Sequence, residues 1–462
     1  MRYWVLPNID TWRPQLERQL SSALATPVSL GHIGADWKGL NPRFDMSDVV
    51  LSDADDKVLF TVPHVQATLS WRSILAMEPL FLSIEASGVD LTLRRDSNQR
   101  IWVMGKSFEL DGTEPFGASP DKRVLTWLAA LPTVNLRDAT LRWVDEYRAA
   151  QPLVLQGVNL NIRNHGYDHQ FSLVAAPPST LGQLLDMRGQ FHRMPTDEAA
   201  HFSMEALKGQ LYARVEEMQP LAWGPWLDLP QNLESGRASA QAWLDLKDGG
   251  IEQFTAELRI QSGKWALGDG AHALTDALSM RVAGPWEGAG RTFPAVRYEV
   301  LAQGLHLDAP DVFERPLSFR SIEAAGMVEG RANETLHVSA DKLNVLNDDV
   351  DARLKGHWEQ GGSSRFGLID LTGTFERARI DAIDDYLPNI VNLEAREWMA
   401  QGLVGGQIDD GRLTLRGDLE FFPFQEDRTK GEFLVQGNYT GGIIDYLPAD
   451  GKTLGWPRLT DM

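Results

Sequence analysis

Apolar and polar residues alternate with a period of two along most of the chain, in runs of about 5 to 10 residues. Clusters of Gly, Asp, Asn and Pro separate the runs, which is typical of half-buried antiparallel strands joined by turns. The clearest hairpin joins residues 238–246 to residues 254–260 through an Asp-Gly-Gly turn. A second, less regular hairpin joins residues 353–358 to residues 366–373. The sequence therefore predicts a mainly β protein.

Three short segments carry helical periodicity instead. An amphipathic helix is predicted after Asp10 because large apolar residues recur there at every fourth position. We expect it to cap the first strands of the sheet. Two further short helices are predicted, one beginning at Ser119 and one over residues 392–401. The apolar stripe of the first helix consists of Trp12, Leu16, Leu20 and Leu24.

Charge and composition exclude several classes of function. The 462 residues include 64 acidic and 44 basic side chains, a formal net charge of -20. This charge repels a phosphate backbone, and no basic stripe offsets it, so nucleic acid is not expected as a partner. The chain has no cysteine, which excludes thiolate catalysis, disulfides and Cys-ligated metals. No run approaches the roughly 18 apolar residues of a membrane helix.

The usual catalytic and cofactor motifs are also missing. Gly-Lys-Ser at residues 105–107 would need a glycine at position 100 to form a phosphate loop, and that residue is Arg100. His165 and His169 have the spacing of a helical zinc site, but Gly166 and the strand-like flanks favour a turn. We therefore expect no enzyme activity, no cofactor and no metal. Long alternating strands without such motifs favour a protein that binds or conducts something apolar.

Several motifs occur in an order that resembles the YhdP-type branch of the AsmA-like family of Gram-negative bacteria. They are Leu6-Pro7-Asn8-Ile9-Asp10, Trp37-Lys38-Gly39-Leu40-Asn41-Pro42, Pro220-Leu221-Ala222-Trp223, Tyr386-Leu387-Pro388 and Phe422-Pro423-Phe424. Ala25 departs from a glycine that is usual in the family two residues before Pro27-Val28. Family members are also much longer, so this chain is expected to be an N-terminal portion without the family's membrane anchor.

The resemblance implies a long, strongly curved antiparallel sheet that forms an open apolar groove, with a few short capping helices. It further implies a periplasmic protein, anchored to the inner membrane by an N-terminal helix absent from this chain. Such a protein would conduct phospholipid between the inner and outer membranes through the groove and support the outer-membrane permeability barrier. Its partners would be phospholipid acyl chains and envelope proteins of unknown identity. The expected division is residues 1–30 for the helix and cap, 31–230 for a first groove segment and 231–462 for a second.

We expect one side chain set to share the concave face, because a period of two places alternate residues of a strand on one side. The expected groove-lining residues are Leu91, Leu93, Leu141, Trp143, Leu244, Leu246, Leu258, Ile260, Leu413 and Leu415. The alternative is a structural or assembly scaffold of the cell envelope, in which the same face packs against a second layer. An open trough would favour conduction, and a packed core would favour the scaffold.

Overall fold

The computed structural model divides into two compact units. The first unit comprises residues 1–229 and 241–252, and the second comprises residues 230–240 and 253–462. The structure describes residues 13–24, 27–52, 58–73, 80–103, 106–108, 130–193, 207–227, 232–248, 250–268, 270–286, 294–330, 335–360, 364, 366–424, 427–446 and 457–460.

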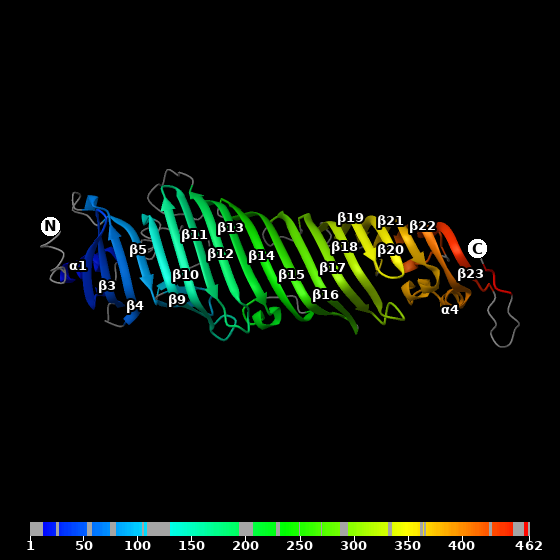
Figure 1. Ribbon diagram of the computed structural model, residues 1–462, viewed down its shortest axis with the longest axis horizontal. Helices are drawn as coiled ribbons and strands as arrows, with labels where there is room; N and C mark the ends of the chain where they lie inside the picture. The colour runs from blue at the N-terminus through cyan, green and yellow to red at the C-terminus, as the bar shows by residue number, and fades with distance from the viewer. Residues whose placement is uncertain are drawn as a thin grey trace. The chain divides into compact units, whose positions relative to one another are not determined.

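The described residues form 23 strands and few short helices, which confirms the mainly β prediction (Figure 1). The elements up to residue 223 are α1 (Arg13–Leu24), β1 (Val28–Ser29), β2 (His32–Lys38), β3 (Asn41–Ser52), β4 (Val58–Leu69), β5 (Phe81–Ser87), β6 (Asp90–Arg95), β7 (Ile101–Val103), β8 (Lys106–Phe108), β9 (Thr133–Asp145), β10 (Leu153–His165), β11 (Asp168–Ala176), β12 (Leu184–Arg193), β13 (Leu207–Met218) and η3 (Pro220–Trp223).

The later elements begin with β14, which contributes residues to both units. They are β14 (Leu233–Lys247), β15 (Gly250–Gly268), β16 (Ala271–Pro285), β17 (Val296–Asp308), β18 (Leu317–Gly330), β19 (Leu336–Leu346), β20 (Val350–Glu359), β21 (Leu368–Arg379), η4 (Ile380–Tyr386), α4 (Leu393–Gly402), β22 (Leu403–Asp418), η5 (Leu419–Phe421) and β23 (Gly431–Ile444).

Most strands pair antiparallel with their neighbours in sequence. In the second unit this holds for each pairing from β15 to β23, including the expected hairpin in which Trp358 of β20 lies opposite Ile369 of β21. The first unit departs from the antiparallel prediction at one place, because β9 runs parallel to both β5 and β6. The sheet is therefore mixed, and it is not closed into a barrel.

Helix α1 covers the beginning of the first unit, as predicted. Leu16 and Leu20 pack against a core cluster that includes residues of β1 to β3. Glu17 accepts a hydrogen bond from the backbone N–H of Leu30 (2.8 Å), and Ser21 accepts one from the N–H of Val28 (2.8 Å). Trp12 and the side chain of Leu24 lie outside the described residues, as does the second predicted helix. The third predicted helix is α4, whose N-cap is Asn392.

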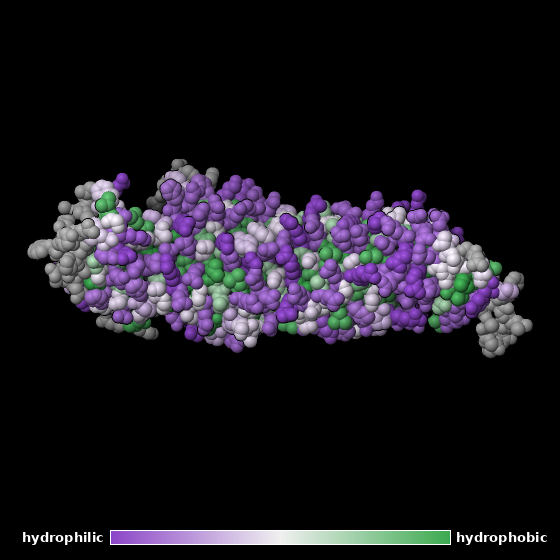
Figure 2. All heavy atoms as spheres, in the orientation of Figure 1, coloured by the Kyte–Doolittle hydropathy of each residue, from purple (hydrophilic) through white to green (hydrophobic). Residues whose placement is uncertain are grey.

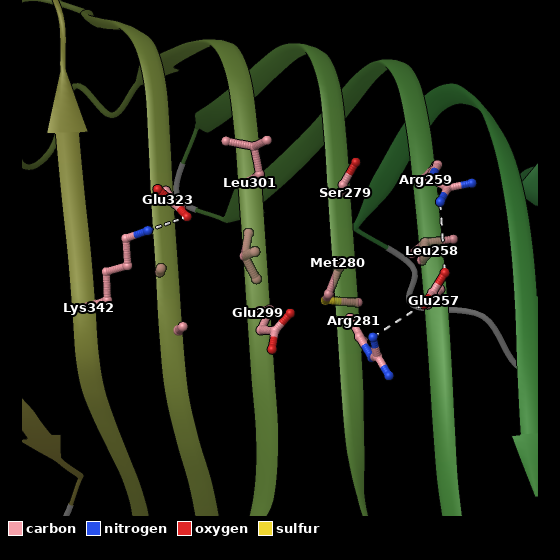
Figure 3. A pocket seen from close by; sticks show the side chains of 13 residues that line it. Glu257, Leu258, Arg259, Ser279, Met280, Arg281, Glu299, Leu301, Glu323 and Lys342 are labelled. Atoms are coloured by element: carbon pink, nitrogen blue, oxygen red, sulfur yellow. Dashed lines mark hydrogen bonds and ion pairs between the residues drawn. The ribbon is translucent and has the colours of Figure 1, made fainter.

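Many strands contain a mid-strand residue with a left-handed backbone. In the second unit these include Ser262 (φ 51°), Gly304 (φ 59°) and Asp410 (φ 49°), and in the first unit Asp138 (φ 49°) and Gly157 (φ 56°). Such residues mark β-bulges, which bend a strand sharply and increase its twist. Figure 3 shows β15 and its neighbours strongly bowed. The strong curvature therefore has a local cause in the backbone.

A buried ion pair joins β6 to β9 in the first unit. Asp145 is 1% exposed and receives two hydrogen bonds from the Arg95 guanidinium, one of them from Nε (2.9 Å), and a third from the N–H of Arg148 (3.1 Å). Burial raises the pKa of Asp145, but the hydrogen bonds and the charge of Arg95 outweigh it and hold that pKa below its usual value. The acid that ends this strand therefore stabilises the sheet.

A second polar network fixes the strand ends next to η4. The buried Asn347 donates from its side-chain nitrogen to the Tyr386 hydroxyl (2.5 Å), and that hydroxyl donates to Asp349 (3.2 Å). Burial raises the pKa of Tyr386 to about 12, and the neighbouring charge of Asp349 acts in the same direction. Together with the buried Ile380 and Ala382, this network covers the turn between β19 and β20.

Candidate functional site

The second unit carries one continuous apolar face. Leu258 of β15 lies opposite Met280 of β16, and the pairing then passes through successive strands to Leu413 of β22. Residues directly opposite each other in a sheet share a face, so the whole series lies on one side. The series is Leu258, Met280, Val300, Ala324, Leu343, Leu354, Gly373, Leu413 and Val435.

Two further rows flank this series on the same side, which we call the apolar face. One row contains Ile260 and ends at Phe375 opposite Gly411, and the other contains Tyr298 and Leu415. The first row is Ile260, Leu278, Ala302, Ile322, Val345, Ala352, Phe375 and Gly411. The second row is Ala256, Val282, Tyr298, Gly326, Ala340, Gly356, Leu371, Leu415 and Phe433.

The central row is only partly covered. Leu258, Val300 and Leu343 are half-buried, although they lie in the middle of long strands. A core side chain under a packed second layer is usually buried almost completely. The central row therefore leaves apolar surface accessible, as a site for an apolar ligand requires.

The opposite, polar face of these strands carries alternating charges. A pocket of about 460 Å³ lies there, with its ion pairs drawn in Figure 3. Lys342 contacts Glu323 (2.5 Å), and Arg281 approaches Glu257 (3.8 Å). The hydrogen bond from Lys342 lowers the pKa of Glu323. Figure 2 shows polar side chains over much of the visible surface of these strands, with apolar side chains in smaller patches.

The expected lining residues of the first unit lie in a more closely packed environment. Leu91 pairs with Leu141, and Leu93 pairs with Trp143, across β6 and β9. Leu91, Leu141 and Trp143 pack against a cluster of buried apolar side chains. Trp223 and Trp226, which follow β13, belong to that cluster and donate their indole N–H groups to backbone carbonyls of the sheet turns.

Leu244 and Leu246 occupy β14, where both are half-buried. Between them in the alternation stands Trp243, whose ring lies 5.4 Å from that of Tyr212. The side chains of Gln210 and Asp245 also meet, by a hydrogen bond of 2.8 Å. Leu244 and Leu246 therefore point to the other side of the strand from this polar and aromatic group.

Nothing among the described residues forms a recognisable catalytic or metal centre. No group of three or more His, Asp or Glu side chains in that part of the chain is arranged to hold a metal ion. His165 and His169 lie at the β10–β11 turn, where Gly166 has φ 60°, and His169 pairs with Asn164 (2.8 Å). No helix in the described ranges is both long and apolar enough to span a membrane.

Comparison with known proteins places this fold. The YhdP protein family model matches residues 1–293 and 279–462. The chain belongs to the YhdP family. A curated relative, the intermembrane phospholipid transporter YhdP of Escherichia coli (strain K12), is 22% identical over 277 residues. The alignment covers 58% of this chain and 20% of that protein's length, so the chain spans about a fifth of the relative. No solved structure matches.

The sequence identified the two ends of the apolar face and missed its middle. Leu258, Ile260, Leu413 and Leu415 share the face by register. The residues that connect them on β16 to β20 were not predicted as lining residues. Their strands also alternate in polarity, as in Leu278, Met280 and Val282, so the signal was present in the sequence. The identity of the residues opposite each other required the register.

Proposed function

We propose that this YhdP-family chain binds phospholipid acyl chains on its apolar faces and serves as part of a conduit for phospholipid between the inner and outer membranes. The observation that carries the proposal is the accessible apolar series from Leu258 to Leu413 in the second unit. Acyl chains gain free energy on leaving water for such a surface, at about 25 cal/mol per Å² of apolar area buried. No catalytic group is needed for passive conduction, and we propose no enzymatic role.

The setting follows from the family rather than from the described geometry. We propose a periplasmic location, with the inner membrane reached through a segment outside this chain, and support of the outer-membrane barrier as the physiological result. The relative's printed name, an intermembrane phospholipid transporter, supports this setting. Envelope partner proteins would then contact surfaces other than the apolar face.

The scaffold alternative is favoured by one observation in the first unit. There, Trp223 and Trp226 join a cluster of buried side chains, against which the expected lining residues Leu141 and Trp143 pack. That stretch resembles a closed core more than an open trough. We therefore place acyl-chain binding first on the second unit, where the central row is half-buried.

Photocrosslinking tests the proposal directly. The chain is mixed with phosphatidylcholine vesicles containing phosphatidylethanolamine that carries a diazirine at the end of one acyl chain. After irradiation, peptide mass spectrometry locates the adducts. We expect adducts on apolar-face residues such as Met280, Val300 and Leu343, and few on polar-face residues such as Arg259. Adducts spread equally over both faces, or absent from the apolar face, would contradict the proposal.

A further inference from the structure

Aromatic side chains gather at one end of the strands of the second unit. Phe254 lies near the start of β15, Trp286 directly follows β16, Trp358 lies near the end of β20 and Phe433 lies near the start of β23. Because these strands alternate in direction, all four positions fall at the same edge of the sheet. We call these four residues the aromatic rim.

The aromatic rim belongs to the apolar face. Phe433 lies opposite Leu415, and Trp358 follows Leu354 by four residues in the same strand alternation. Phe254 precedes Leu258 by four residues in an unshifted part of β15. The ring of Trp286 meets that of Phe254 edge to face, with 5.7 Å between centroids.

The rim is exposed, and its polar groups face its outer side. Trp286 is 51% exposed and Phe433 is 41% exposed. The indole nitrogen of Trp358 donates to the backbone carbonyl of Phe366 (2.9 Å), in the turn beyond the strand end. Phe433 also contacts the ring of Phe422, with 5.2 Å between centroids. The rim thus offers broad aromatic surface between an aliphatic interior and water.

The rest of the apolar face differs in chemistry. The central row from Leu258 to Leu413 has no aromatic side chain. At the opposite strand ends, η4 covers the turns, and Ile380, Ala382 and Leu387 are buried there. Aromatic residues nearer that side, such as Phe375, are buried as well. An exposed aromatic zone therefore exists along one edge of the face.

We propose that the aromatic rim holds the glycerol and headgroup region of a bound phospholipid, while the acyl chains lie on the aliphatic central row. The inference rests on the proposed function and adds an orientation to it. Trp, Tyr and Phe side chains favour positions where one side is apolar and the other is wet, as in the aromatic belts of membrane proteins. The edge covered by η4 offers no equivalent zone.

Two labelled lipids test this orientation on the complete chain. One is phosphatidylethanolamine with a diazirine on the headgroup amine, and the other carries the diazirine at the end of an acyl chain. Each is presented in phosphatidylcholine vesicles, and adducts are located by peptide mass spectrometry. We expect headgroup adducts near Trp286 and Phe433, and acyl adducts near Val300.

Matched variants separate a positioning role from mere proximity. Trp286→Leu combined with Phe433→Leu should lower the yield of headgroup adducts at the rim at least fivefold and leave acyl adducts within twofold of wild type. The control is Trp243→Leu, which removes a tryptophan of similar exposure (39%) that stacks on Tyr212 in the first unit. It should change neither yield.

The outcomes distinguish the two claims. Headgroup adducts concentrated at the η4 edge, or equal at both edges, would overturn the orientation while acyl adducts on the central row still supported the proposed function. An unchanged headgroup yield in the double variant would also overturn the orientation. Absence of acyl adducts from the apolar face would remove the proposed function, and the orientation with it.

Discussion

Leu258 and Leu413 lie on the same face of the second unit, although most of that unit's sequence separates them. Each intervening strand contributes one residue to the register that connects them. A slip of one residue in any of these pairings would place the two leucines on opposite faces. The apolar face is therefore a property of the whole set of strands.

A charge on this face should block lipid binding without unfolding the protein. We expect Leu258→Glu to reduce crosslinking of acyl-labelled lipid severalfold, because a charge on an apolar path resists desolvation. Leu258 is half-buried, so the carboxylate can stay near water and should cost only about 1 to 2 kcal/mol of stability. Thermal melting and crosslinking yield are measured together. The control Arg259→Glu places the same charge on the polar face and should keep wild-type crosslinking. A Leu258→Glu chain that crosslinks normally, or that does not fold, would contradict an open apolar face.

The Arg95 and Asp145 pair should be important for the stability of the first unit. Asp145→Ala leaves the Arg95 charge without its buried partner, so we expect a loss of about 3 to 5 kcal/mol in the free energy of unfolding. The neighbouring pair of Arg94 and Glu146 is exposed, and Arg94→Ala should cost less than about 1 kcal/mol. Denaturant unfolding of both variants measures the difference. Equal losses would mean that burial of Asp145 has no special effect.

The same pair should make the first unit sensitive to acid. The pKa of Asp145 is lower in the folded chain than its usual value. Its contribution to stability is therefore complete above the unfolded pKa of about 4 and is lost as the pH falls through the lower, folded value. Unfolding measured from pH 6 to pH 2 should show this loss in the wild type and a shallower one in Asp145→Asn. Parallel pH profiles would contradict the assignment.

Tyr386 should give the second unit an alkaline limit. Its pKa rises from 10.0 to about 12 on folding, so the stabilisation is complete below pH 10 and is lost as the pH rises toward 12. Tyr386→Phe should remove that dependence and, by leaving Asn347 with one partner fewer, cost about 1 to 3 kcal/mol at neutral pH. Tyr446→Phe is the control, because Tyr446 is 67% exposed. A Tyr386→Phe profile as steep as that of the wild type would refute this account.

The bulge at Ser262 should be detectable by substitution. Ser262 is exposed and has φ 51°, which glycine adopts freely and a β-branched residue does not. We expect Ser262→Gly to be neutral or stabilising by up to about 1 kcal/mol and Ser262→Val to destabilise by about 1 to 2 kcal/mol. Gln261→Val, at the adjacent exposed position with ordinary strand backbone, should change little. If valine costs the same at both positions, the left-handed backbone at Ser262 carries no strain.

The period of two was sufficient to predict the strands, since each strand must bury one face and wet the other. It also predicted that Leu413 and Leu415 share a side. It could not predict the parallel pairing of β9 with β5 and β6, because strand direction depends on a connection that carries no periodic signal. Nor could it predict the bulges, which shift the alternation by one residue at positions such as Asp138 where the side chain gives no warning.

The candidate site was only partly predictable for the same reason. Co-facial placement within a strand follows from spacing, but placement across strands needs the register, so Met280 and Val300 were missed between Leu258 and Leu413. The difference in packing between the units was also invisible. Trp223 and Trp226 join the buried cluster of the first unit through a turn, and no local pattern indicates which distant side chains such a turn will cover.

Native mass spectrometry of the purified chain tests the central claim most directly. Protein expressed in Gram-negative bacteria and released gently from detergent should carry phospholipid, seen as discrete adducts with the mass of one or more membrane lipids. The Leu258→Glu variant should lose these adducts and Arg259→Glu should retain them. A wild-type chain without lipid, or adducts that persist unchanged in Leu258→Glu, would contradict acyl-chain binding on the apolar face of the second unit.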